Sequence, residues 1–172
     1  GCYIAMEKYT DALKDYDKAI DLAPENPLYL NTRADFYETQ ENYDEALKDY
    51  ATVIEISTDD DQTTRAINNR ALIYEDQEKY DWAVAEYTKA IVINPERYLY
   101  YSNRRLTYRD TLKDYEKALE DCTSAIGLDK EKPESYDNRE DCYIAMEKYT
   151  DALKDYDKAI DLAPENPRWY NN

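Results

Sequence analysis

The sequence contains no histidine, only two glycines and three cysteines, and each shortage excludes a class of protein. Without histidine, the usual general acid–base group, the usual activator of a nucleophile and a common zinc ligand are missing. Gly1 and Gly127 cannot form a glycine-rich phosphate loop, and so few glycines argue against an all-β fold with glycine turns. Three cysteines are too few, and odd in number, for a disulfide framework. We therefore predict no catalytic residues, no metal site and no cofactor.

Long apolar runs are also missing. Nothing approaches the roughly 18 apolar residues that cross a bilayer, and no signal-peptide core is present. The net charge is −17, from 39 acidic and 22 basic residues, and this charge repels nucleic acid and anionic membranes. It either attracts basic partners or simply forms a solvated outer face. We expect no nucleic-acid partner, no membrane insertion and a reducing, cytoplasmic location, while any targeting segment would lie outside this sequence.

Tyrosine, in contrast, is abundant, and most of the 20 tyrosines recur at fixed positions. A Tyr-x-x-Ala motif occurs five times, with steps of 34, 37, 35 and 34 residues between successive alanines. The motif alanines are Ala12, Ala46, Ala83, Ala118 and Ala152. Another tyrosine precedes each motif, and a third follows each alanine by four residues, except where Cys122 replaces it. A tyrosine column at repeat spacing indicates a core rather than a ligand site.

Each repeat is predicted to form two helices. In the second repeat, Leu30, Ala34 and Tyr37 have the three-and-four spacing of one buried helical face, and the same spacing recurs from Tyr43 to Ile54. Proline stands where first helices are expected to begin, at Pro27, Pro133 and Pro167. One such pair cannot bury its own apolar stripe, so neighbouring pairs must stack into a solenoid.

The spacing, the Tyr and Ala columns and the prolines resemble the tetratricopeptide repeat family over the whole chain. The resemblance implies an all-α, right-handed superhelical solenoid of antiparallel helix pairs, residues 1–172 forming one array. Its expected divisions are a partial repeat at 1–26 (the end of a first helix plus a second helix), repeats at 27–63, 64–97, 98–132 and 133–166, and the start of a further helix at 167–172. Residues 61–63 are expected to form an inserted loop. The small residue expected at the helix–helix contact, present as Ala34 and Ala71, is replaced by Arg105 and Glu140, so packing should differ there.

Residues 2–27 are identical to residues 142–167. The copies are 140 residues apart, which equals a block of four repeats. A recent duplication in a natural gene and an engineered origin both explain this identity. In either case we infer that the chain is a window onto a longer array.

Two charged columns follow the repeat. Arginine occupies one first-helix position, on or beside the buried face, and an acidic residue precedes the aromatic position of each second helix. The columns are Arg33, Arg70, Arg104 and Arg139, and Asp15, Asp49, Glu86, Asp121 and Asp155. Because an unpaired buried charge is costly, we predict arginine–carboxylate pairs of structural role, within or between neighbouring repeats, with arginine stacked on tyrosine.

An asparagine column precedes three of those arginines: Asn69, Asn103 and Asn138, with Asn172 next in register and Thr32 in the second repeat. The resemblance implies that first helices line a concave groove, so these residues, with Asn31 and Asn68, are candidate peptide-binding residues. An amide both donates and accepts, and such a column is similar to the asparagine ladder of the O-GlcNAc transferase repeats. The alternative is that these amides cap or bridge helices locally.

The groove positions also indicate the charge of a ligand. Family members that bind chaperone tails hold a carboxylate with basic side chains, whereas the corresponding positions here are Asn31, Asn68, Ser102, Asp137, Asp35, Leu72, Leu106 and Asp141. An uncharged-to-acidic groove favours a neutral or basic extended segment over a chaperone tail.

Three functional hypotheses remain open. The first is a non-catalytic protein–protein interaction scaffold that binds an extended, neutral-to-basic peptide. The second is a scaffold that self-assembles through its ends or its groove, and the third is the targeting arm of a larger enzyme. Cys122 and Cys142 should lie roughly opposite each other, either as a disulfide or as two buried thiols.

Overall fold

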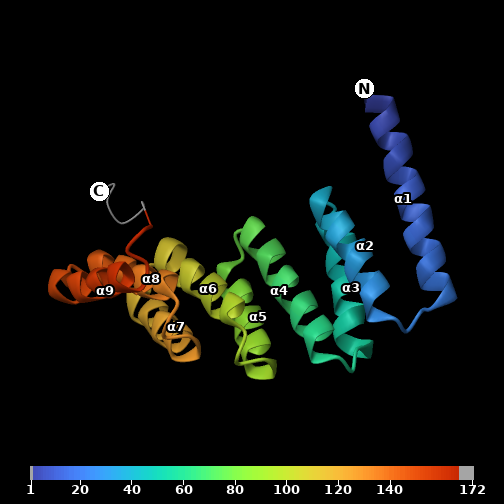
Figure 1. Ribbon diagram of the computed structural model, residues 1–172. Helices are drawn as coiled ribbons and strands as arrows, with labels where there is room; N and C mark the ends of the chain where they lie inside the picture. Colours follow the sequence, from blue (N-terminus) through green and yellow to red (C-terminus); the bar gives the residue numbers. More distant parts are fainter. Residues whose placement is uncertain (1, 167–172) are drawn as a thin grey trace. The chain divides into compact units, whose positions relative to one another are not determined.

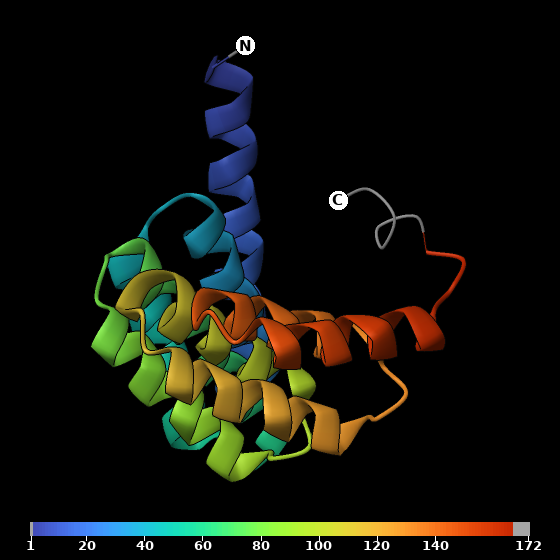
Figure 2. The same cartoon turned by 90° about the vertical axis from the view of Figure 1, so that its left-hand side faces the viewer.

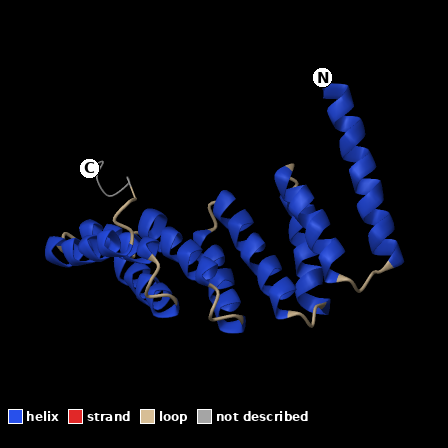
Figure 3. Ribbon diagram, in the orientation of Figure 1, coloured by secondary structure: helices blue, strands red, loops and turns tan. Residues whose placement is uncertain are grey.

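The computed structural model describes the backbone of residues 2–166 and the side chains from residue 9 to residue 166. All regular elements in this range are helices, as Figure 3 shows, which confirms the all-α fold class. The chain divides into two compact units, Gly1–Asn94 and Pro95–Asn172. Pro167 and Asn172, which the sequence assigned to a further helix, lie outside the described residues.

The first unit consists of α1 (Cys2–Leu22), α2 (Pro27–Thr39), α3 (Tyr43–Ile56), α4 (Asp60–Asp76) and α5 (Tyr80–Ile93) (Figure 1). α2 pairs with α3 and α4 pairs with α5 in antiparallel hairpins, and α3 packs on α4. Its main core cluster is formed by Leu30, Ala34, Ala46, Tyr50, Val53, Ala66 and Ile73. The predicted Tyr and Ala columns therefore supply this core.

The second unit consists of α6 (Tyr98–Leu106), the π-helix η1 (Thr107–Leu112), α7 (Tyr115–Leu128), α8 (Pro133–Ala145) and α9 (Tyr149–Leu162). The pairs α6–α7 and α8–α9 are again helical hairpins, and α7 packs on α8. Pro27 and Pro133 begin α2 and α8, where a missing N–H costs no intrahelical bond.

The turns inside the hairpins explain why the chain manages with so little glycine. Each contains one non-glycine residue in the left-handed region: Glu41, Glu78, Lys113 and Glu147, with φ between 56° and 59°. The backbone N–H that follows bonds back to the first helix, as from Lys79 to the carbonyl oxygen of Tyr74 at 2.7 Å. This is the usual helix-ending geometry, adopted here by glutamate and lysine at a modest steric cost.

Two of the repeat steps, of 37 and 35 residues, are longer than 34. In both, the extra residues lie inside a first helix. Residues 61–63 do not form the expected inserted loop, because they lie in the first turn of α4, which has 17 residues against 13 in α2. The side chain of Asp59 caps this longer helix by accepting the N–H of Gln62 at 3.0 Å. The single extra residue of the 35-residue step lies in the helix that continues from α6 into η1, since a π-turn accommodates one inserted residue.

The two identical segments have different conformations. Residues 142–145 end α8, and a turn with Glu147 at φ 58° leads into α9. Residues 2–22 instead form α1 as one continuous helix, without the expected turn near residue 7 (Figures 1 and 2). In α8, residues 133–141 complete a first helix that pairs with α9 and holds the turn. In α1 the same residues, which include good helix formers, continue the helix.

Candidate functional site

The arginine and acidic columns meet inside each hairpin. Arg33 donates from Nε and Nη2 to the two carboxylate oxygens of Asp49, each at 2.7 Å. Arg139 bonds Asp155 in the same two-pronged way at 2.6 Å, and Arg104 bonds Asp121 at 3.0 and 2.5 Å. The remaining pair is Arg70 with Glu86, at 2.9 Å from Nε. Each pair joins a first helix to its own second helix, so these residues hold hairpins together.

Tyrosine rings complete this arrangement. The guanidinium of Arg33 lies 5.9 Å from the ring centroid of Tyr37, and that of Arg104 lies 6.0 Å from that of Tyr108. Asp15 is the exception in the acidic column: it is exposed, because this sequence supplies no first-helix arginine before it. On α1 it is Asp17, and not Asp15, that accepts a hydrogen bond from Arg33, at 2.5 Å.

The asparagine column is largely engaged inside the units. Asn69 donates to Asp35 at 2.9 Å and to the Tyr50 hydroxyl at 3.2 Å, and its own oxygen accepts from Asn68 at 3.1 Å. Asn138 donates to the hydroxyl of Tyr98 at 2.9 Å. These amides therefore bridge consecutive first helices, as the local alternative described.

The neighbouring candidates show the same tendency. Asn31 is fully buried and donates to the side-chain oxygen of Gln62 at 2.9 Å. The hydroxyl of Thr32 bonds to the carbonyl of Leu28 on its own helix at 2.8 Å. Asn103 lies half-buried on α6. Of the candidate peptide-binding residues, Asn103 and Asn138 lie on the side of the first helices that carries the exposed surface described below.

The first unit contains a polar cluster that the sequence did not predict. The hydroxyl oxygen of Tyr50 lies 2.7 Å from a carboxylate oxygen of Asp35 and 2.8 Å from one of Glu38. One hydroxyl proton cannot serve two carboxylates. Asp35 also accepts from Arg65 and Asn69, so a proton taken up by this cluster goes to Glu38. Burial accordingly raises the pKa of Glu38 above its ordinary value.

This cluster predicts a pH-dependent effect of Glu38→Gln. A carboxyl group with a raised folded-state pKa adds stability below its unfolded pKa, and this contribution is lost as the pH rises through the folded pKa. Glutamine can donate to the Tyr50 oxygen at every pH. We expect the free energy of unfolding of Glu38→Gln to exceed that of the parent by about 1 kcal/mol at pH 7. The difference should vanish near pH 4. Urea unfolding between pH 4 and 8 measures it, with the exposed Glu55→Gln as control. A constant difference across this range contradicts the shared-proton arrangement.

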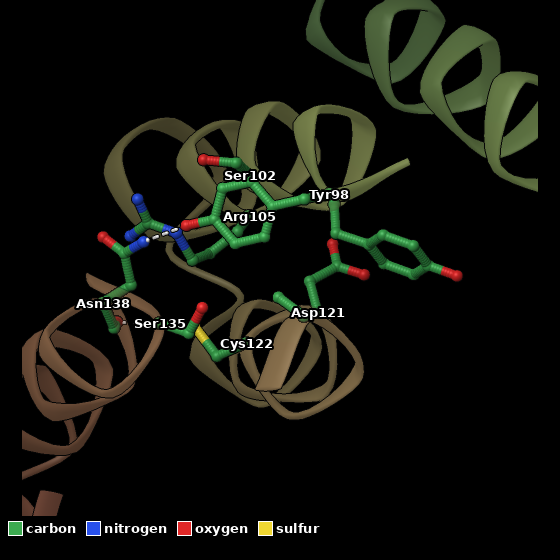
Figure 4. A pocket seen from close by; sticks show the side chains of 9 residues that line it. Tyr98, Ser102, Arg105, Asp121, Cys122, Ser135 and Asn138 are labelled. Atoms are coloured by element: carbon green, nitrogen blue, oxygen red, sulfur yellow. Dashed lines mark hydrogen bonds between the residues drawn. The ribbon is translucent and has the colours of Figure 1, made fainter. Parts of the chain in front are cut away.

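The second unit contains a tight pocket around Arg105 (Figure 4). Arg105, Cys122 and Ser135 line it, together with the bonded pair Tyr98 and Asn138. Arg105 is only 5% exposed, and its Nε and Nη1, like the Ser135 hydroxyl, have no hydrogen-bond partner. The pocket leaves no room for a water molecule. Arg105 thus fills the space beside Cys122, whereas Ala34 and Ala71 occupy this repeat position in the α2–α3 and α4–α5 hairpins.

The two cysteines beside this pocket are free thiols. Cys122 and Cys142 are buried, and their sulfur atoms are 3.8 Å apart, so the structure has two thiols and not a disulfide. A hydrogen bond from Cys122, helped by the nearby charges of Arg105 and Arg109, lowers the pKa of the Cys142 thiol.

The exposed face of the first helices is a surface available to a ligand. In the second unit we define the unit-2 face as Leu99, Asn103 and Leu106 on α6, and Glu134, Asp137, Asp141 and Ile144 on α8. Within each helix these residues are three, four or seven positions apart, so they share one side. Leu99, Leu106 and Ile144 are exposed large apolar residues. Arg109 bonds Asp141 at 2.5 Å and joins the two halves. The first unit has a similar arrangement, with exposed Leu28 beside Asp35 and Arg65.

No group of three or more Cys, Asp or Glu residues able to hold a metal ion occurs among the described residues. Within the same range, every helix is too short or too polar to cross a membrane.

Stacked helical hairpins, joined by aromatic and small-residue columns and leaving one face of each first helix open, define a helical-repeat interaction scaffold. The chain belongs to the tetratricopeptide repeat family, whose models match residues 25–95 and residues 2–26 and 134–166. The predicted family and fold are thereby confirmed.

Solved structures agree with this assignment. The first TPR of Spaghetti (RPAP3), bound to the HSP90 peptide SRMEEVD, is 30% identical, with a TM-score of 0.56 over 64% of this chain and 86% of that chain. MamA is 17% identical, with a TM-score of 0.76 over 95% and 94%. YrrB, described as a TPR protein with an unusual peptide-binding site, is 18% identical, with a TM-score of 0.69 over 96% and 84%. No curated protein matches the sequence significantly.

Proposed function

We propose that the chain is a non-catalytic scaffold that binds an extended, neutral-to-basic peptide in the concave groove lined by its first helices, along the exposed face of these helices. The composition of the unit-2 face supports this proposal, because α6 contributes two exposed leucines and α8 contributes three carboxylates and the exposed Ile144. Apolar side chains of a ligand would contact Leu99, Leu106 and Ile144. Its basic side chains would lie near the carboxylates of Glu134 and Asp137.

The arginines of these faces support the same charge preference. Arg65 is paired with Asp35 and Arg109 with Asp141, so neither guanidinium stands as an isolated positive charge. An acidic ligand would have to break such a pair and approach a chain of net charge −17. The first TPR of Spaghetti was solved with an acidic HSP90 peptide, and this chain is expected to prefer the opposite charge.

Peptide binding tests the proposal. Three labelled peptides of equal length, built from alanine and leucine with lysine, glutamine or glutamate, are compared by fluorescence anisotropy. We expect the lysine peptide to bind best and the glutamate peptide worst. The variant Glu134→Gln with Asp137→Asn should weaken lysine-peptide binding about three- to tenfold, because two nearby charges are lost.

The control has the same net charge but a different location. Glu116 and Glu120 are exposed on the second helix α7, and Glu116→Gln with Glu120→Gln should leave affinity unchanged. Equal losses in both variants would indicate non-specific attraction to an acidic protein. Tightest binding of the glutamate peptide would overturn the proposal.

A further inference from the structure

Two cysteines from consecutive repeats meet inside the second unit. Cys122 belongs to α7, the second helix of one repeat, and Cys142 belongs to α8, the first helix of the next repeat. Their sulfur atoms are 3.8 Å apart, and both side chains are buried. A disulfide requires about 2.05 Å between the sulfur atoms. The pair is therefore reduced, but only a short movement separates it from a disulfide.

The hydrogen bonds of the pair give the two thiols different roles. The sulfur of Cys122 lies within reach of two acceptors, the carbonyl oxygen of Asn138 at 3.4 Å and the sulfur of Cys142. As the donor, Cys122 keeps its proton, and the hydrogen bond to Cys142 raises the pKa of Cys122. The same bond lowers the pKa of Cys142, because it stabilises the thiolate. Cys142 is thus the nucleophile of the pair.

Arg105 adds a positive charge next to the two sulfur atoms. It lines the pocket that also contains Cys122, as Figure 4 shows, and its Nε and Nη1 have no hydrogen-bond partner. Its charge, with that of Arg109, favours the thiolate of Cys142. A buried guanidinium without a counter-charge is costly, and a thiolate on Cys142 reduces this cost. A thiolate beside a positive charge is the reactive form of cysteine.

We propose that Cys122 and Cys142 form a redox-sensitive pair, which peroxide converts into a disulfide that links two consecutive repeats. The bond would join two residues that are 20 positions apart in the sequence and hold α8 on α7 covalently. At the α3–α4 junction of the first unit, the equivalent positions carry Tyr50 and Ile73, so the same link cannot form there.

The reaction balances with hydrogen peroxide as the oxidant. The thiolate of Cys142 attacks one peroxide oxygen and the O–O bond breaks. This step gives a sulfenic acid on Cys142 and a hydroxide ion, which takes up a proton and becomes water. The sulfur of Cys122 then attacks the sulfenic sulfur, the S–S bond forms and the S–O bond breaks. The departing oxygen leaves as a second water with the proton of Cys122, and two electrons have passed from the sulfur atoms to the peroxide.

Burial makes this reaction depend on local opening. The pocket beside Cys122 has no room for a water molecule, so peroxide enters only when this part of the unit opens. Tyr108 and Leu119 pack against the two cysteines and are themselves only partly buried. Tyr108 lies in η1, where the π-helical turn interrupts the regular α-helix. Small movements of these two side chains therefore expose the sulfur atoms to a small oxidant.

Peptide mapping of the full chain tests the proposal. The reduced chain is exposed to hydrogen peroxide, free thiols are blocked with N-ethylmaleimide, and tryptic peptides are analysed by mass spectrometry. We expect peptide 118–130 joined to peptide 140–148, at a mass two hydrogen atoms below their sum, and dithiothreitol should restore both thiols. Cys2 lies in the separate peptide 1–8, so its oxidation is followed independently. Cys122 and Cys142 that remain free thiols after Cys2 is fully oxidised would overturn the proposal.

Two controls show whether the folded structure directs the reaction. In concentrated urea the three cysteines should pair without preference. A link between peptides 118–130 and 140–148 that is no more frequent in the folded chain than in urea would contradict the proposal. Peptide binding at the unit-2 face is not involved, so the outcome is independent of the proposed function.

The variants Arg105→Met and Arg105→Lys separate the charge of Arg105 from its volume. Arg105→Met removes the charge and should slow oxidation at pH 7 roughly tenfold, because a rise of one unit in the pKa of Cys142 lowers its thiolate fraction by that factor. Arg105→Lys retains the charge and should react at nearly the parent rate. A purely structural role predicts the opposite, since a loosened pocket admits peroxide more easily. Faster oxidation in both variants would therefore overturn the role of the Arg105 charge.

Discussion

Arg104→Met is expected to lower the free energy of unfolding by about 3–5 kcal/mol. Arg104 donates two hydrogen bonds to Asp121, a residue only 2% exposed, and lies over the ring of Tyr108. Methionine retains most of the apolar volume but leaves a buried carboxylate without its counter-charge. The loss therefore reflects the stranded charge of Asp121 and not a cavity. Denaturant unfolding followed by circular dichroism measures it.

Two comparisons identify the cause of this loss. Adding Asp121→Leu to Arg104→Met should recover most of the stability, since two apolar residues leave no buried charge. Lys154→Met, which breaks the exposed pair with Asp151, should change stability by less than about 1 kcal/mol. If Arg104→Met proves as mild as Lys154→Met, the buried pairs do not hold the hairpins.

Acid should partly rescue the Arg104→Met variant. Burial already raises the pKa of Asp121 while Arg104 opposes that rise. Without Arg104 the pKa rises further, so the folded variant holds a proton more tightly than the unfolded chain. That contribution is present below the unfolded pKa and lost as the pH rises, so the stability deficit should shrink on acidification.

The arginine–carboxylate pairs were predictable because helix periodicity fixes them. Residues at one repeat position share a depth, and Arg33 and Asp49 both occupy positions on the buried side of a hairpin. A buried arginine needs an anion, and the facing column offers one in each hairpin. Register therefore identified the two columns as partners, and the structure shows that each pair lies within one hairpin.

The roles of the asparagines were not predictable in the same way. Register places Asn69 on the inner side of α4, but its bonding depends on what the preceding repeat presents there. Asp35 and Tyr50 supply two acceptors to Asn69. The equivalent positions are Leu72 and Tyr87 in the repeat before Asn103, and Leu106 and Cys122 in the repeat before Asn138. The surface positions vary from repeat to repeat, so a column of one residue type does not define one function.

The conformation of the inserted residues was also not predictable from the sequence. A three-residue excess at 61–63 is equally compatible with a longer loop and with a longer helix. The side chain of Asp59 caps the N-terminus of α4 and thereby favours the longer helix. Identical sequences in α1 and at the α8–α9 junction also differ, because the turn near Glu147 depends on an upstream helix that packs back. Local sequence sets helical propensity, whereas packing partners decide where a helix ends.

Cys122→Tyr is expected to destabilise the chain by about 2–4 kcal/mol, although tyrosine occupies this position in the other hairpins. There, Tyr50 and Tyr87 are fully buried opposite Ala34 and Ala71. In this hairpin Arg105 replaces the alanine and already fills the pocket beside Cys122. In this hairpin the first helix carries the large residue, Arg105, and the second helix carries the small one, Cys122. A tyrosine at position 122 therefore has no space.

A double-mutant cycle measures this exchange. Arg105→Ala alone should cost about 1–2 kcal/mol, since the cavity it leaves outweighs relief of the two unpaired guanidinium nitrogens. Arg105→Ala with Cys122→Tyr should lie within about 1 kcal/mol of the parent, which corresponds to a coupling of at least about 2 kcal/mol. Ala71→Arg in the α4–α5 hairpin is the reciprocal control and should be strongly destabilising, with partial recovery on adding Tyr87→Cys. Additive effects in both hairpins would mean that Arg105 and Cys122 are unrelated substitutions. Coupling in both would show that an arginine at this repeat position requires a small residue at the facing position of the second helix.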